Sequence, residues 1–178
     1  MKAGSPLRIL SFDISLSSPG VAVVEIRDGK AKVISVSHVK TDAKQPYAVR
    51  SRMIESWAHL FIAEHQSKSK PYHVVVRERY AGKFGLLAMF SAHAAVDRAL
   101  FDYGLAELSD AEKPIPQQTV KKQVVGKGRA EKSEVENAVR QLTDYLGEFK
   151  TDDTSDAVAI ALCWAIQNDK IERIKLTN

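Results

Sequence analysis

Residues 7–39 read LRILSFDISLSSPGVAVVEIRDGKAKVISVSHV, and this stretch decides the fold. Three short runs rich in β-branched residues follow one another here, separated by Pro-Gly and Asp-Gly pairs that are typical of turns. The pattern predicts a three-stranded antiparallel meander. Its expected strands are residues 7–15, 21–26 and 32–39, with turns at Pro19-Gly20 and Asp28-Gly29.

The remainder of the chain alternates helical and extended patterns. Apolar residues recur at helical spacing in 47–65 and 84–101, and the run HVVVR between these segments is typical of a central strand. A short strand and two helices complete the order βββ-α-β-α-β-α-α. This order predicts an α/β fold with a mixed five-stranded sheet covered by helices on both faces. The last three expected elements are residues 115–118, 133–146 and 154–167.

Composition limits the classes of protein that remain. The length of 178 residues suits one domain, residues 1–178, and the net charge of +4 is compatible with a polyanionic partner. The single cysteine, Cys163, excludes an intramolecular disulfide and suits a reducing compartment. Because the sequence shows neither a signal-peptide pattern nor an apolar run long enough to span a membrane, we expect a cytoplasmic protein with no membrane partner.

Four acidic residues stand at the ends of elements that this fold would bring together. Asp13 ends the strand in ILSFDIS, Glu78 follows HVVVR, and Asp153 and Asp156 begin the last helix in DDTSDAVAIA. Burying a carboxylate costs several kcal/mol unless the group is paired or binds a metal. The four residues therefore predict a Mg²⁺ or Mn²⁺ site, and two such ions can drive phosphodiester hydrolysis.

Two of these acids also have structural explanations. Asp13 suits the turn that precedes SLSSPG, and Glu78 is placed to form an ion pair with Arg77 or Arg79. Local sequence alone leaves these alternatives open.

The last helix presents a similar choice. Asp153 as the N-cap residue with Asp156 three positions later resembles a capping box. Asp152 also shares a helix face with Asp156, so local spacing does not separate Asp152 from Asp153.

Two segments carry a resemblance to a known family. VKKQVVGKGRAEKSEVENAVRQL (residues 120–142) and DDTSDAVAIALCW (residues 152–164) resemble the RuvC family of Holliday-junction resolvases. The order of the acids, one on the first strand, one on the fourth and Asp-x-x-Asp on the last helix, also matches that family's active-site pattern and selects Asp153. The resemblance implies a ribonuclease H-like fold.

The resemblance also implies an activity. The chain is expected to be a homodimeric, metal-dependent endodeoxyribonuclease that resolves four-way DNA junctions by paired symmetric nicks. Asp13, Glu78, Asp153 and Asp156 would hold two Mg²⁺ or Mn²⁺ ions at each active site. One departure is that Ile14-Ser15 follows Asp13 where the bacterial family typically has Pro-Gly. This departure predicts a divergent branch, such as a phage or viral one acting in the host cytoplasm.

Basic residues gather around two glycines in the segment between the fourth strand and the last helix. A loop of this composition can approach phosphates closely, although most such charge runs are simply solvated surface. By resemblance, Lys121 (or Lys122, if the register slips by one) and Lys132 match lysines that act in junction binding or catalysis. The predicted DNA-binding set here is Lys121, Lys122, Lys127, Arg129 and Lys132.

The segment after Glu78 is expected to contribute to the same surface. Arg77, Arg79 and Lys83 add positive charge there. The family inserts an aromatic residue into the junction from this loop, but the matching position here is Ala81. The nearby aromatic candidates for unstacking a base are Tyr80 and Phe84, and both equally suit packing against helix 84–101.

Helix 84–101 is apolar around most of its circumference, which predicts cover by the sheet on one side and by a second copy of the chain on the other.

Several rival functions remain open. Other branched DNA or RNA–DNA hybrids are alternative substrates. A non-cutting junction-binding module is an alternative class of protein, and a plain interaction domain is another. The sequence has no glycine-rich nucleotide loop, so we expect no small-molecule cofactor. His93 is expected to be a satisfied core or interface residue.

Overall fold

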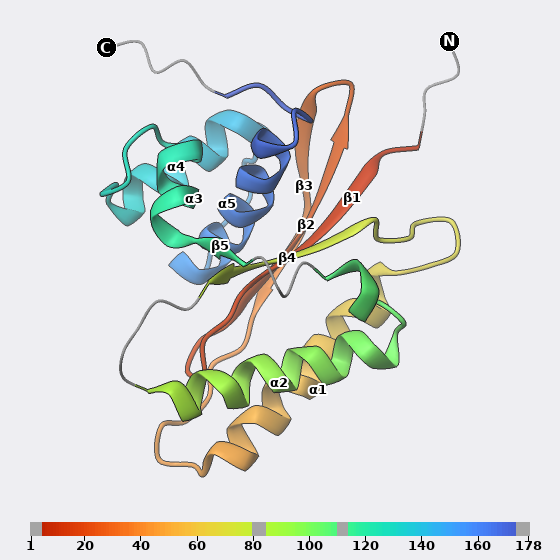
Figure 1. Cartoon of the computed structure of the whole chain (residues 1–178), viewed down its shortest axis with the longest axis vertical. Coiled ribbons are helices and arrows are strands. Elements are labelled where there is room, and N and C mark those ends of the chain that lie inside the picture. Colours follow the sequence, from red (N-terminus) through yellow and green to blue (C-terminus); the bar gives the residue numbers. More distant parts are fainter. Residues whose placement is uncertain (1–4, 80–84, 110–113, 174–178) are drawn as a thin grey trace.

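The computed structural model describes residues 5–79, 85–109 and 114–173, and its centre is one twisted sheet (Figure 1). Strands β1 and β2 pair antiparallel, as do β2 and β3, whereas β4 runs parallel to β1 and β5 runs parallel to β4. The order across the sheet is β3-β2-β1-β4-β5, so the predicted mixed five-stranded sheet is confirmed. The strands are β1 (Leu7–Asp13), β2 (Gly20–Arg27), β3 (Lys30–His38), β4 (Val74–Arg79) and β5 (Ile115–Pro116).

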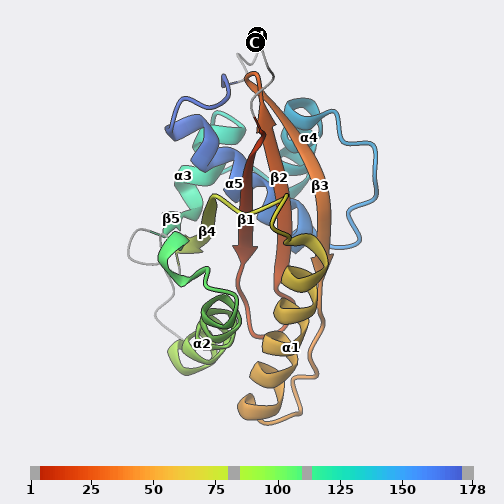
Figure 2. The same cartoon turned by 90° about the vertical axis from the view of Figure 1, so that its right-hand side faces the viewer.

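Helices cover both faces of this sheet. In Figures 1 and 2, α1 and α2 lie side by side on one face and α3, α4 and α5 lie together on the other. The predicted layers are therefore confirmed. The helices are α1 (Tyr47–His65), α2 (Leu86–Asp102), the short 3₁₀ helix η1 (Ala106–Leu108), α3 (Gln117–Val124), α4 (Lys132–Thr143) and α5 (Asp152–Gln167). No helix in the described ranges has the length and apolarity needed to cross a membrane.

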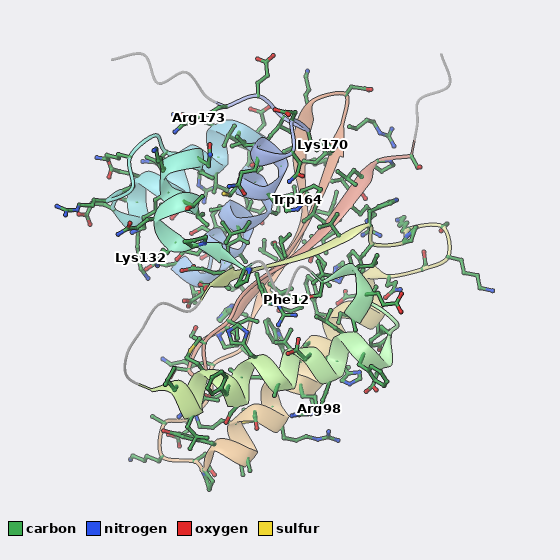
Figure 3. All side chains as sticks on the ribbon, viewed as in Figure 1. Phe12, Arg98, Lys132, Trp164, Lys170 and Arg173 are labelled. Atoms are coloured by element: carbon green, nitrogen blue, oxygen red, sulfur yellow. The ribbon has the colours of Figure 1, made fainter. Side chains whose placement is uncertain are left out.

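The two-residue period of β1 separates two hydrophobic cores. Leu10 and Phe12 (Phe12 is labelled in Figure 3) enter the core shared with α1 and α2. There Phe12 meets Trp57 edge-on, with ring centroids 6.5 Å apart. Ile9 belongs to the core under α5. Ser11 is fully buried on that same side and donates a hydrogen bond to the carbonyl of Ala157 in α5, at 2.7 Å.

Two sequence-based assignments were wrong. The expected strand over residues 115–118 ends at Pro116, and helix α3 begins at the next residue, because proline ends the pairing and suits a helix start. Helix α4 ends at Thr143, where Asp144 adopts a left-handed backbone with φ of 51°. Leu146, the last residue of the expected helix 133–146, lies beyond α4 and is 97% exposed.

Candidate active site at the rim of the sheet

Asp13 and Glu78 reach the same rim of the sheet on neighbouring parallel strands. The last paired residues of β1 and β4 are Phe12 and Arg77, so Asp13 and Glu78 follow at the next step. The pleat places Asp13 on the face of Ile9 and Glu78 on the face of Val76, which is the face covered by α5.

The first turn of α5 lies against this rim. Gly20 stands opposite Asp13 in the pairing of β1 with β2, and a Cβ at Gly20 would overlap the backbone carbonyl of Asp153. Gly20 was predicted as a turn residue, but it is the first residue of β2. Because it has no side chain, the first turn of α5 can lie close to the strand at this position. The N-cap residue of α5 is Thr151, so the capping-box explanation for Asp153 is wrong.

Electrostatic coupling shows that the four predicted acids lie together. Burial raises the pKa of Asp13 well above its usual value, and the charges of Glu78, Asp156 and Asp153 raise it further. Burial, followed by the charge of Asp156, raises the pKa of Glu78 to about 7. Burial is also the main reason why the pKa of Asp156 rises to about 6. These carboxylates share one partly desolvated site in which each charge opposes its neighbours.

Two of the predicted lysines act on this acidic set. The charge of Lys121 lowers the pKa of both Glu78 and Asp156, whereas Lys122 is exposed, so the structure favours the first register for this segment. Lys132 Nζ lies 3.1 Å from Asp152 Oδ2, and its charge lowers the pKa of Asp13 and Asp156.

The adjacent acids of α5 are also distinguished. Asp152 is paired with Lys132, the first residue of α4 (labelled in Figure 3). Asp153 acts on Asp13 and accepts a hydrogen bond from Ser18. The selection of Asp153 for the carboxylate set agrees with this geometry.

Other predicted DNA-contacting residues are placed differently. Lys127 and Arg129 are exposed in the segment between α3 and α4, and Lys127 Nζ lies 2.5 Å from Glu134 Oε1. Arg77 was expected near the Glu78 loop, but it is buried on the opposite face, where its Nη2 lies 2.8 Å from Asp97 Oδ1. This placement also excludes Arg77 as the ion-pair partner of Glu78, because consecutive strand residues point to opposite faces.

The aromatic candidates are not tested by the structure. Tyr80, Ala81, Lys83 and Phe84 lie outside the described residues, and Arg79 is the last residue of β4. Their predicted roles in DNA binding stay predictions.

Sequence reasoning missed three residues that shape the site or its surroundings. Ser18 donates a hydrogen bond from Oγ to Asp153 Oδ2 at 2.8 Å, a link between residues 135 positions apart that has no local sequence signal. The close approach at Gly20 was likewise invisible. The direction of Arg77 did have a signal, since the alternation in HVVVRE places it opposite Glu78.

His93 was expected to be a satisfied core or interface residue, and this stays a prediction. Its Nε2 atom is buried and has no hydrogen-bond partner among the described residues, and burial followed by the charge of Arg77 lowers its pKa.

The acidic set fits a hard divalent cation by charge and donor type. Its donors are all carboxylate oxygens, and a cation would relieve the repulsion that raises the pKa of Asp13, Glu78 and Asp156. Within residues 5–79, 85–109 and 114–173, no group of three or more histidine, cysteine, aspartate or glutamate side chains is gathered closely enough to hold a metal ion. The acids are linked by the effect of their charges on one another's pKa.

Solved structures define the class of fold. RuvC from T. thermophilus in complex with a Holliday junction substrate superposes with a TM-score of 0.74 at 23% identity, covering 91% of this chain and 94% of that one. The fowlpox virus Holliday junction resolvase superposes with a TM-score of 0.51 at 13% identity, covering 91% and 99%. The fold is therefore ribonuclease H-like, as expected.

Sequence comparison then gives the family. The family described as "Crossover junction endodeoxyribonuclease RuvC" matches residues 9–164. A protein of that name from Alkaliphilus metalliredigens is 33% identical over 162 residues, covering 88% of this chain and 92% of the relative. One from Magnetococcus marinus is 27% identical over 168 residues, covering 92% and 86%. The chain belongs to the RuvC family of crossover junction endodeoxyribonucleases.

Proposed function

We propose that this chain resolves four-way DNA junctions by cutting one phosphodiester in each of two opposed strands, with two Mg²⁺ or Mn²⁺ ions at each active site. Asp13, Glu78, Asp153 and Asp156 would hold the ions. The observation that carries the proposal is the convergence of acids from β1, β4 and α5 on one rim, where burial and neighbouring negative charge raise the pKa of Asp13, Glu78 and Asp156. A domain that only binds DNA has no need for acids beside phosphates, which such acids repel.

The protein's own residues supply binding and charge compensation. When bound, two divalent ions activate a water for in-line attack and stabilise the leaving 3′-oxygen. Lys121 and Lys132 flank the carboxylates and offset part of their charge, so an approaching phosphate meets a rim that is not purely acidic. The ammonium group of Lys132, which is paired with Asp152, would stabilise negative charge that develops on the attacked phosphate.

Exposed basic residues would extend the DNA surface beyond the acids. Lys122, Lys127 and Arg129 are exposed on α3 and the segment that follows it. Phosphate contacts of this kind fix the position of DNA without reading its sequence. They suit a substrate that is recognised by branched shape.

A second copy of the chain would complete the function. Helix α2 exposes a stripe of large apolar side chains, with Leu87 68%, Phe90 66% and Phe101 74% exposed, on the face opposite its buried alanines. Covering this stripe with the same stripe of a second copy makes a two-fold dimer, and the two sites of such a dimer match the symmetry of a four-way junction. Leu87→Glu is expected to give monomers by light scattering and to abolish paired nicks, whereas Leu146→Glu, at an isolated exposed leucine, should leave the mass unchanged.

The deciding experiment is cleavage of a labelled four-way junction with Mg²⁺ or Mn²⁺, beside duplex, flap and RNA–DNA hybrid controls. Symmetric paired nicks in the junction alone support the proposal. Equal cutting of flaps or hybrids would replace it with a broader nuclease, and tight binding without cutting would replace it with a binding module. Asp13→Asn should bind junctions at least as well as wild type but not cut them, because it removes a negative charge that faces phosphates. Retained cutting by this variant would refute the metal assignment.

A further inference from the structure

The loop between β1 and β2 reaches across to α5 through one side chain. Ser18 is half-buried, and its hydroxyl donates a hydrogen bond to Asp153 Oδ2 at 2.8 Å. The backbone N–H of Ser18 donates in turn to Ser15 Oγ at 3.0 Å, which folds the loop back on itself. The loop that leaves the strand of Asp13 therefore holds an acid on the facing helix.

A buried arginine braces the same loop from α1. Arg50 is 5% exposed, and it donates from Nε to Thr41 Oγ1 and from Nη2 to Ser17 Oγ, both at 2.9 Å. Thr41 Oγ1 donates to the carbonyl of Leu16 at 2.6 Å, and its backbone N–H donates to the carbonyl of Ser17 at 2.9 Å. These bonds anchor the two residues before Ser18, so the Ser18 hydroxyl is presented from a fixed loop.

A hydroxyl bonded to one carboxylate oxygen has a definite physical consequence. It restricts rotation of the carboxylate about its side-chain torsion and so fixes the direction in which the second oxygen points. Partners of this kind commonly orient metal-binding carboxylates, and their loss weakens metal affinity by about 10- to 100-fold.

We infer that Ser18 is a positioning residue for Asp153: it holds Oδ2 and leaves the second oxygen to bind a divalent cation. The inference rests on the proposed metal-dependent function and adds to it a residue outside the carboxylate set. Arg50 and Thr41 support Ser18 by fixing the loop that carries it.

A matched pair of variants isolates the hydroxyl. Ser18→Thr keeps the donor, whereas Ser18→Val has the same shape as threonine and lacks the donor. Ser18→Ala removes the hydroxyl without adding volume, and Ser69→Ala is the control, since Ser69 is exposed in the segment before β4. Circular dichroism melts in EDTA would show that all four variants are folded.

The first readout is Mn²⁺ binding to the DNA-free protein, measured by calorimetry or by electron paramagnetic resonance. Ser18→Ala and Ser18→Val are expected to bind Mn²⁺ on the order of 10-fold more weakly than wild type, while Ser18→Thr and Ser69→Ala bind like wild type. In junction cleavage, the same two variants should need about 10-fold more Mg²⁺ for half-maximal rate, and excess metal should restore most of that rate.

Two failures can be told apart. A wild-type chain that binds and cuts, together with a Ser18→Val variant of unchanged Mn²⁺ affinity and Mg²⁺ requirement, overturns the inference alone. A wild-type chain that neither binds Mn²⁺ nor cuts junctions refutes the proposed function and, with it, the role of Ser18.

Discussion

Replacing Glu78 by glutamine should stabilise the metal-free protein at neutral pH while abolishing cleavage. The carboxylate of Glu78 is desolvated at the rim of the sheet and lies in the field of Asp156. Its charge therefore costs folding free energy that a neutral carboxamide of the same shape does not. The same charge is what the proposed metal site requires, so stability and activity should move in opposite directions.

The magnitude follows from the pKa of Glu78. The folded-state pKa is about 7 and the usual value is 4.5. At about 1.4 kcal/mol per pKa unit, the ionised carboxylate costs about 3 kcal/mol above pH 7. For a chain of this length that corresponds to a gain in Tm of roughly 6–12 °C for Glu78→Gln.

The sign of the pH dependence is fixed by the direction of that shift. Because the folded-state pKa is raised, the folded protein holds a proton on Glu78 between about pH 4.5 and 7, where the unfolded chain has already lost it. Wild-type stability should therefore fall as pH rises through this window. The advantage of Glu78→Gln should be near zero at pH 4.5 and complete above pH 7.

Urea denaturation in EDTA at several pH values between 4.5 and 8 measures this directly. Glu64→Gln, at an exposed position of α1, is the matched control and should track wild type at every pH. An unchanged or lower stability of Glu78→Gln at pH 8 would refute the reasoning, because it would mean that the charge of Glu78 is not opposed by its surroundings.

Three further predictions concern Gly20, the ion pair of Arg77 with Asp97, and Lys121. Gly20→Ala places a Cβ against the carbonyl of Asp153 and should cost about 1–3 kcal/mol in urea denaturation, with cleavage reduced far more than by Ala22→Gly. Asp97→Ala leaves the buried guanidinium of Arg77 without its acid and should cost about 1–3 kcal/mol, whereas Arg77→Met removes the charge itself and should cost less in the same melts. Lys121→Ala should slow cleavage and lower the slope of log affinity against log salt by about 1, which binding titrations would show.

The local spacing of apolar and β-branched residues was sufficient to predict much of the fold. Alternating and β-branched runs predicted β1 to β4, and helical spacing predicted α1 with both of its ends. Helix α3 was missed because its eight residues, Gln117–Val124, are polar on most positions and follow two prolines. Its place is set by packing against α5, which no local pattern contains.

The sequence singled out the candidate acids, but it did not reveal the residues that hydrogen-bond to them. Asp13 and Glu78 stand at or near strand ends and Asp156 in the second turn of α5, and the free-energy cost of burying a carboxylate draws attention to such positions in a sequence. Ser18 lies in SLSSPG with two other serines, and only the folded loop decides which hydroxyl meets Asp153. The departure at Ile14-Ser15, which predicted a divergent branch of the family, falls in this same loop, and that branch stays a prediction.

The acidic residues at this rim come from the ends of β1 and β4 and from the start of α5. The start of α5 supplies a partial positive charge that favours acids in its first turn, where Asp152 and Asp153 stand. Asp156 lies one turn further along, and Glu78 comes from the sheet. The charge of Lys132, and then that of Lys121, lowers the pKa of Asp156, whereas Lys121 lowers that of Glu78. Their pKa values, about 6 and about 7, show that this compensation is incomplete in the metal-free fold. The remaining deficit of positive charge lies where the proposed ions would bind, so the same imbalance that lowers the stability of the free protein would strengthen its hold on a divalent cation.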